Sequence, residues 1–269
     1  MVKRHCRKRT VSRLLSSSRV RGHLTAGALA VCVVEGRGRR RTIVGKEQFP
    51  FDPGVRAAAW RACRDWVYAM ARRAPIEWVL GSIEVKYLLL PWTPDLADSM
   101  LREAFARASF EQKFRLDPSL YEVRFANSPY LHPQLAAFVE RTLLAEIKAH
   151  ADELQAPIAR IEPSVTTVWG RFSALLGNES GALCLVEGDR QLIVQHARTR
   201  ITHVALRPFG ADDPEGLFRV QAGEVRRVFS SMPTCPALEQ VEARLALPDG
   251  RGFDAERDIA YAFALCGVI

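Results

Sequence analysis

The chain has no apolar run of the roughly 20 residues that a membrane-spanning helix requires. Its best apolar run, from Ala26 to Val34, is too short and too rich in strand-forming residues. The basic first residues lead into no apolar core of the kind that secretory signal peptides carry. We therefore expect a protein that is not exported, whose 269 residues build one large domain or two similar lobes.

Paired cysteines are also missing. The six cysteines lie far apart, and no two of them form a C-x-x-C pair. This spacing argues against a zinc site and against a disulfide scaffold. The sequence thus predicts isolated thiols in a cytosolic protein, and no metal site.

Acidic residues are nearly missing from the first 46 residues, which hold thirteen Lys or Arg against Glu35 alone. That segment carries a net charge of +12, so the rest of a chain of +8 overall carries −4. We predict a basic disordered arm over residues 1–22 that binds an anionic membrane surface or nucleic acid. The candidate contacts are Lys3, Arg4, Arg7, Lys8, Arg9 and Arg13. A solvated extension without a partner remains the alternative, and the lack of aromatic residues in the arm weakens a base-stacking role.

Two strand pairs lie half a chain apart, at 23–51 and 182–209. Each consists of an apolar run, a short turn with glycine and a second apolar run, which predicts a hairpin. Helical patterns follow, so we predict an α/β fold of two similar lobes, each a mixed sheet flanked by helices. The first lobe is expected to span residues 23–162, and the second, smaller lobe residues 163–269.

Two of the predicted helices have well-marked apolar stripes that should face inward. One helix is expected to start at Thr93-Pro94 and the other at His132-Pro133. The first stripe consists of Leu96, Met100, Leu101, Ala104, Phe105 and Ala108, and the second of Leu135, Phe138, Val139, Leu143 and Ile147.

A family resemblance rests on three segments. The segment VLGSIEVKYLLLPWT, from Val79 to Thr93, resembles the strand-turn-strand of the PilM-type proteins of type IV pilus machinery. Ile161-Glu162-Pro163-Ser164 and Leu185-Val186-Glu187-Gly188 extend the likeness over roughly residues 23–269. The chain is similar in the same way to the cytoplasmic part of the L component of type II secretion. The resemblance implies the actin-like branch of the ribonuclease H-like fold.

The resemblance also says where a nucleotide would bind. Active actin-like ATPases carry Asp-x-Gly in the first strand pair, where the aspartate orients Mg²⁺-bound water and the glycine lets backbone amides reach phosphate. Here Thr25 and Gly27 take these places, so the carboxylate is lost. In the second pair the place is taken by Glu187-Gly188, and the glycine-rich adenosine clamp corresponds to Ser230-Ser231 without any glycine. The resemblance implies the remnant of a nucleotide site, without ATP hydrolysis or a cofactor, although Gly27 and Gly188 are equally explained as turn glycines.

Motifs of other enzyme classes fail on spacing. The stretch from Gly38 to Lys46 is no P-loop, because Glu47 stands where a hydroxyl must bind magnesium. A nuclease of the ribonuclease H type needs a carboxylate on the first strand, which has no acid before Glu35. We therefore expect that the protein is not an enzyme.

A partner surface is predicted at Tyr87, Leu90, Pro91 and Trp92, where an apolar strand ends. These side chains could form the wall of a groove that holds a partner's extended peptide, or Trp92 could pack in the core. The family resemblance implies that the peptide is the cytoplasmic tail of a bitopic inner-membrane platform protein, and that an assembly ATPase is a further partner. The protein would then be cytoplasmic and peripheral to the inner membrane.

Three functions remain open at this point. The first is a non-catalytic scaffold of a type IV pilus or type II secretion-like assembly platform. The second is an adaptor that binds nucleic acid or anionic lipid through the basic arm. The third is an active actin-like ATPase.

Overall fold

The computed structural model describes residues 18–52, 54–127, 131–176, 180–198, 200–212, 225–239, 241 and 243–268. The six basic residues predicted to make contacts from the arm, Lys3 to Arg13, lie outside the described residues. No helix in the described part of the chain is both long and apolar enough to cross a membrane.

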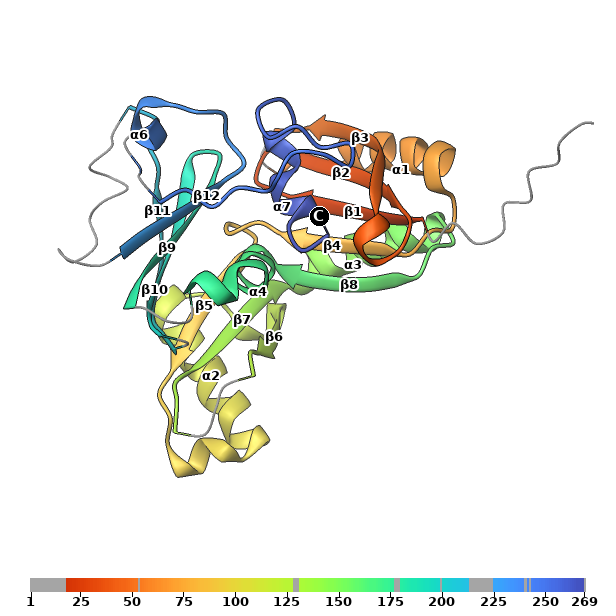
Figure 1. The fold of residues 1–269 in the computed structure, drawn as a ribbon. Coiled ribbons are helices and arrows are strands. Elements are labelled where there is room, and N and C mark those ends of the chain that lie inside the picture. The colour runs from red at the N-terminus through yellow and green to blue at the C-terminus, as the bar shows by residue number, and fades with distance from the viewer. Residues whose placement is uncertain are drawn as a thin grey trace, which may run out of the picture.

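The first lobe is built on a five-stranded mixed sheet with the strand order β3-β2-β1-β4-β8 (Figure 1). Its strands are β1 (Arg19–Leu24), β2 (Ala28–Glu35), β3 (Thr42–Pro50), β4 (Ile76–Leu80) and β8 (Ile158–Pro163). β1, β4 and β8 run parallel, whereas β2 and β3 are antiparallel to their neighbours. Helices α1 (Ala57–Ala71) and α3 (Arg141–Glu153) belong to this lobe, and the short helix η1 (Gly38–Arg40) joins β2 to β3. β4 is buried along its whole length, as expected for an inner strand covered on both faces, and its one charged residue, Glu77, forms ion pairs with Arg19 and Arg21.

The start of β1 corrects the predicted extent of the arm. β1 begins at Arg19, so the last four of the 22 residues predicted as disordered form a strand. Val20 is buried, and the buried guanidinium of Arg21 pairs with the carboxylate of Glu77 at 2.9 Å. From charge alone, Arg19 and Arg21 cannot be told apart from the basic residues of the arm. Their partner Glu77 lies on β4, which is distant in sequence.

The second lobe is a four-stranded sheet with the order β11-β10-β9-β12. Its strands are β9 (Ser180–Glu187), β10 (Arg190–Ala197), β11 (Arg200–Pro208) and β12 (Val225–Ser230), of which β12 is parallel to β9. Helix α4 (Ser164–Leu176) contacts β4, β8 and β9, so it packs against both lobes. Helix α6 (Pro236–Glu239) follows β12.

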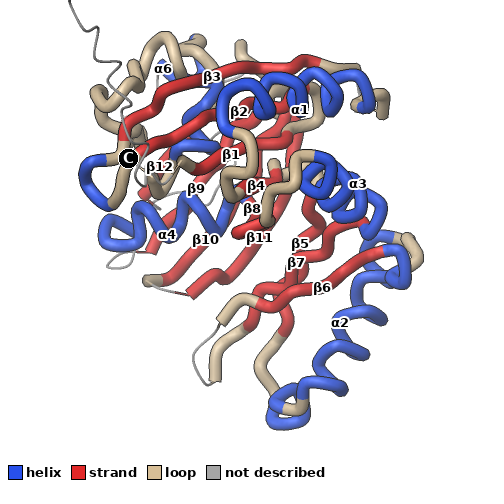
Figure 2. The backbone as a smooth tube through the Cα atoms, turned by 90° about the vertical axis from the view of Figure 1, so that its right-hand side faces the viewer, coloured by secondary structure: helices blue, strands red, loops and turns tan. Residues whose placement is uncertain are grey.

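A third sheet, which the sequence did not predict, has the antiparallel order β5-β7-β6. It consists of β5 (Val85–Leu90), β6 (Tyr121–Phe125) and β7 (Gln134–Glu140), with helix α2 (Ser99–Phe114) on one face (Figure 2). The predicted helix start at His132-Pro133 is therefore wrong, since residues 134–140 form a strand and the helix begins only at Arg141. The spacing of Leu135, Phe138 and Val139 fits a helix, but pairing of β7 with two neighbouring strands overrides it.

The predicted inward face of α2 is also wrong. The helix buries Ala106 and Phe110, while Met100 is 79% exposed and Leu101 55% exposed. The helix starts at Ser99 rather than at Thr93-Pro94, because the carboxylate of Asp98 accepts the amide hydrogens of Met100 and Leu101. The short helix η2 (Pro94–Ala97) occupies the predicted start, and η3 (Pro118–Leu120) precedes β6.

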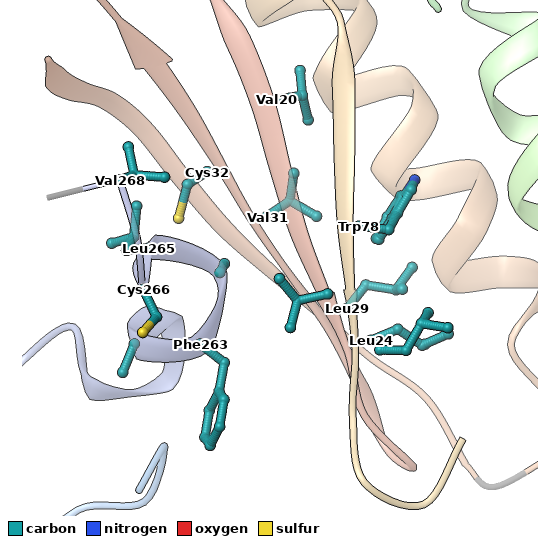
Figure 3. Close-up of a cluster of buried hydrophobic side chains, with 14 of the residues drawn as sticks. Val20, Leu24, Leu29, Val31, Cys32, Trp78, Phe263, Leu265, Cys266 and Val268 are labelled. Carbon is teal, nitrogen blue, oxygen red and sulfur yellow. The ribbon is translucent and has the colours of Figure 1, made fainter. Parts of the chain in front are cut away.

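The C-terminal segment returns to the first lobe. After η4 (Ile259–Tyr261), helix α7 (Ala262–Leu265) contacts β1, β2 and β4. Figure 3 shows Phe263, Leu265 and Cys266 on one side of the sheet and Trp78 on the other. The two lobes therefore share this core, and the predicted boundary at residue 163 stays a prediction.

Candidate functional site at the junction of the two lobes

The junction is the place where three turns from the two lobes meet. The β1–β2 turn holds Thr25 and Gly27, and the loop after β4 starts at Gly81 and Ser82. The amide of Gly81 donates to the carbonyl of Leu24 at 2.7 Å, which joins these two segments of the first lobe. A Cβ on Gly81 would lie 2.7 Å from Oε2 of Glu187, so the end of β9 in the second lobe approaches as closely as glycine permits.

The side chain of Glu187 fills the centre of this junction. Its Oε2 atom accepts the amide hydrogen of Ser82 at 2.7 Å and lies 3.8 Å from Nε2 of His23. The side chains of His23 and Glu187 are 1% and 4% exposed, so this pair is closed off from solvent. The ring of His23 also stacks on Phe263, with ring centroids 4.8 Å apart. A carboxylate of the second lobe is thus held by groups of the first lobe.

The electrostatics of the junction favour a charged Glu187. Burial by itself would raise the pKa of this carboxyl, but the nearby His23 ring, with Ser164 and the Ser82 amide, holds the pKa below its usual range. Burial and the nearby Glu187 charge raise the pKa of Tyr87, which keeps its hydroxyl protonated. A phosphate group brought to this place would meet a fixed negative charge.

Thr25 and Gly27 take part in their own turn. Oγ1 of Thr25 accepts the amide hydrogen of Ala28 at 3.1 Å and lies 3.1 Å from the Ala28 carbonyl oxygen. A Cβ on Gly27 would make an ordinary contact of 3.7 Å with the carbonyl oxygen of Phe51. Glycine is therefore not sterically required at this position, and the threonine hydroxyl closes the turn.

Glu187-Gly188 and Ser230-Ser231 are brought together at one end of the second sheet. The amide of Ser231 donates to the carbonyl of Val186 at 3.2 Å, and Oγ of Ser230 accepts the amide hydrogen of Met232 at 2.9 Å. Gly188 has a φ of +62°, which the β9–β10 turn requires and glycine adopts without strain. The predicted remnant residues of the second lobe thus adjoin one another, and Glu187 connects them to the first lobe. Among the described residues, no group of three or more His, Cys, Asp or Glu side chains could hold a metal ion.

An open groove of about 840 Å³ lies between β8 and the third sheet. β8 is an edge strand, so its outer backbone groups pair with no further strand of the sheet in the described part of the chain. The lining mixes apolar and charged side chains: Leu80, Tyr87, Glu122, Leu135, Ala137, Val139, Leu144, Lys148, Arg160 and Ile161. A smaller cavity of about 270 Å³, which includes Trp169 and Ile201, shares Ala126, Leu135 and Thr166 with the groove. The two concavities therefore adjoin each other.

The four residues predicted as a partner surface have different surroundings. Tyr87 lines the groove, although only 5% of it is exposed. Leu90 is buried on the opposite face of the third sheet, in the cluster that contains Phe110 of α2. Pro91 is exposed and Trp92 is half-buried. Alternation along β5 separates Tyr87 from Leu90, so the predicted surface is not one continuous wall.

Sequence reasoning missed His23 and the groove. The available signal for His23 was a histidine at the start of a largely apolar run, but its partner Glu187 lies in the other half of the chain. No pattern could reveal the groove, because its walls come from β6, β7, β8 and α3, and β7 was predicted as helix.

Comparison with known proteins shows the fold. No protein-family model and no curated protein sequence matches the chain. The cytoplasmic domain of EpsL, an inner membrane component of the type II secretion system of Vibrio cholerae, is similar in structure, with a TM-score of 0.61 and 13% identity over 94% of this chain and 97% of that one. The PilM-PilN type IV pilus biogenesis complex gives a TM-score of 0.65 and 13% identity over 92% of this chain and 96% of that one.

A third similar structure carries the name of the fold. It is a Bacteroides thetaiotaomicron protein of unknown function with an actin-like ATPase fold, with a TM-score of 0.53 and 11% identity over 84% of this chain and 86% of that one. The mixed sheets flanked by helices agree with these neighbours. The predicted fold class and the predicted structural resemblance are thereby confirmed, and the chain has the actin-like ATPase fold of the EpsL cytoplasmic domain and PilM.

Proposed function

We propose that this protein is a non-catalytic scaffold of a type IV pilus or type II secretion-like assembly platform, and that its groove binds the cytoplasmic tail of a membrane partner. The observation that carries the proposal is the open groove beside the unpaired edge of β8. Similarity in fold to EpsL and to PilM of the PilM-PilN complex supports this class of machine. The protein would act on the cytoplasmic face of the inner membrane.

The groove suits an extended apolar peptide for two reasons. The unpaired edge of β8 offers backbone groups to which a peptide strand can add. Beside it, Leu135, Leu144 and Ile161 offer apolar surface. Burial of two or three apolar side chains at about 1.5–3 kcal/mol each gives micromolar affinity after ordering costs.

The filled junction supports the absence of catalysis. The Glu187 carboxylate already accepts the Ser82 amide that could otherwise face an anion, and its charge would repel phosphate. Titration calorimetry of the full chain with Mg²⁺-ATP should reveal no binding tighter than about 1 mM, which corresponds to roughly 4 kcal/mol. Micromolar binding, or turnover that a Glu187→Gln change abolishes, would contradict the non-catalytic role.

A matched pair of substitutions tests the groove. Ala159 and Ala104 are both exposed alanines, but Ala159 lines the groove and Ala104 lies on α2. We expect Ala159→Trp to block the groove and lose the membrane partner in a pull-down from the native host, while Ala104→Trp retains it. The thermal midpoint of both variants should stay within a few degrees of the parent. Equal capture by both variants would show that the groove is not the tail site.

A further inference from the structure

One end of the first sheet gathers loops that carry exposed arginines and the half-buried Arg41. β1, β4 and β8 start at this end, as the pairs Val20 with Ile76 and Ile76 with Ile158 show. β2 ends beside the start of β1, since Arg19 pairs with Val34. The loops before β3 and β4 therefore meet here. We call it the basic end and define it by Arg19, Arg37, Arg40, Arg41, Arg72 and Arg73.

Most of this charge is not neutralised within the protein. The carboxylate of Glu77 forms ion pairs with Arg19 and Arg21, and the carboxylate of Glu153 forms one with Arg64. Arg72 lies over the ring of Tyr68, and Arg73 donates to the neutral side chain of Gln155. Within the described residues no carboxylate forms an ion pair with the other five arginines of the basic end, Arg37, Arg40, Arg41, Arg72 and Arg73.

The sequence adds further charge at the same place. Ser18 leads directly into β1 at the basic end. The preceding 17 residues hold Lys3, Arg4, Arg7, Lys8, Arg9 and Arg13 and no acidic residue. The most basic segment of the sequence therefore leads directly into an end of the described sheet that carries arginines without an ion pair.

We propose that the basic end docks on the anionic headgroups of a phospholipid membrane. A flat anionic surface can meet loops from several strands at once, and each Lys or Arg that reaches it strengthens partition roughly fivefold. A single-stranded nucleic acid is less suited, because the first 17 residues contain no aromatic side chain. Tyr68 lies on the surface, but Arg72 covers one face of its ring, with the guanidinium carbon 4.6 Å from the ring centroid, so that face cannot stack on a base.

The basic end lies next to one end of the groove, but docking at the basic end does not require the groove. Ile158, the first residue of β8, lies at this end and lines the groove. A protein docked in this way would hold one end of its groove close to the membrane. The docking itself needs no tail peptide, so its failure and the failure of the tail-binding proposal can be told apart.

Vesicle co-sedimentation of the full chain tests the proposal with two matched triple variants. The first, Arg37→Gln with Arg40→Gln and Arg41→Gln, neutralises one loop of the basic end. The second, Arg115→Gln with Arg207→Gln and Arg257→Gln, removes the same charge from exposed positions elsewhere. The vesicles contain phosphatidylcholine alone or with 30 mol% phosphatidylglycerol, and a short DNA duplex serves as the competing anion.

We expect binding to anionic vesicles only, weakened at least tenfold by the first triple variant and less than threefold by the second. Unchanged thermal midpoints establish that both variants are folded. Equal losses in the two variants would mean that net charge alone drives binding and would overturn the proposal. So would binding to neutral vesicles of the same strength, or DNA that displaces the protein from vesicles at equimolar phosphate.

Discussion

The junction of the lobes and the groove beside β8 adjoin one another, but side chains fill the junction and leave the groove open. Tyr87 belongs to both, since its ring lines the groove while the Glu187 charge raises the pKa of its buried hydroxyl. The junction is occupied by the protein's own carboxylate and imidazole, whereas the groove remains open. We therefore expect the junction to contribute to stability and the groove beside the third sheet to bind a partner.

The largest expected effect comes from breaking the pair at the junction. Glu187→Ala should cost about 3–5 kcal/mol of the free energy of unfolding, because it leaves His23 and the Ser82 amide buried without their partner. Glu111→Ala, at an exposed position on α2, should change it by less than about 0.5 kcal/mol. Urea denaturation measures both. A loss below about 1 kcal/mol for Glu187→Ala would mean that the pair does not stabilise the junction.

The next largest effect on stability is expected on the face of the third sheet that packs under α2, opposite the groove. Leu90→Ala should cost about 2–5 kcal/mol, since Leu90 is buried under α2. The groove lies on the other face, so a folded Leu90→Ala variant, assayed below its thermal midpoint, should still capture the membrane partner. Trp92→Ala should cost less stability than Leu90→Ala because Trp92 is half-buried. Loss of the partner in folded Leu90→Ala would place the binding surface under α2 instead.

A smaller effect depends on pH. Burial lowers the pKa of His150 to about 4, with Cys63 Sγ 3.9 Å from its Nε2 atom and Trp60 and Trp78 beside its ring. Below pH 6.5 the unfolded chain binds a proton at His150 that the folded chain does not. Stability should therefore fall as pH decreases from about 6.5 to 4, by at most about 1.4 kcal/mol per pH unit. The pKa of Glu187 is lowered, so its contribution is lost only below the unfolded value of about 4.3.

Two variants test whether His150 causes this pH dependence of stability. His150→Gln should flatten the slope of unfolding free energy between pH 6.5 and 4.5, measured by urea denaturation at several pH values. His203→Gln, at an exposed position on β11, should leave the slope as it is in the parent. An unchanged slope in His150→Gln would show that another group is responsible.

The smallest effect on stability is expected from the arm. Substitution of Lys3, Arg4, Arg7, Lys8, Arg9 and Arg13 by Gln in the full chain should leave the thermal midpoint unchanged, because the described core begins at β1. Binding to anionic vesicles should fall, and what remains should weaken steeply with salt. A lowered midpoint would show that the arm contributes to the fold. The predicted arm over residues 1–22 includes Val20 and Arg21, which are buried in β1, so the substitutions stop short of them.

Local pattern was enough for the strands whose partners are close in sequence. Both hairpins follow from apolar runs and turn residues, and they were predicted correctly. The strand β7 was not, because Leu135, Phe138 and Val139 fit the helical period and only pairing with β5 and β6 decides between the two. The inward face of α2 failed for a related reason. Phe105 and Phe110 lie on different faces of the helix, and only the third sheet selects Phe110.

The candidate site was predictable only as a set of positions. The family resemblance indicated Thr25, Glu187 and Ser230, but not that a carboxylate would be tied to His23 across the lobes. Long-range pairs of this kind depend on topology rather than on spacing. The groove depends on it even more, because its walls exist only when the third sheet stands beside β8.

The proposed function requires that the groove binds a membrane partner's tail while the junction is closed. Photo-crosslinking in the native host tests it most directly, with a photoreactive phenylalanine analogue at Leu144 in the groove and, as control, at Leu101 on α2. We expect the Leu144 position alone to crosslink to the cytoplasmic tail of a single-pass membrane protein, identified by mass spectrometry. Crosslinks to that tail from Leu101 but none from Leu144 would contradict it.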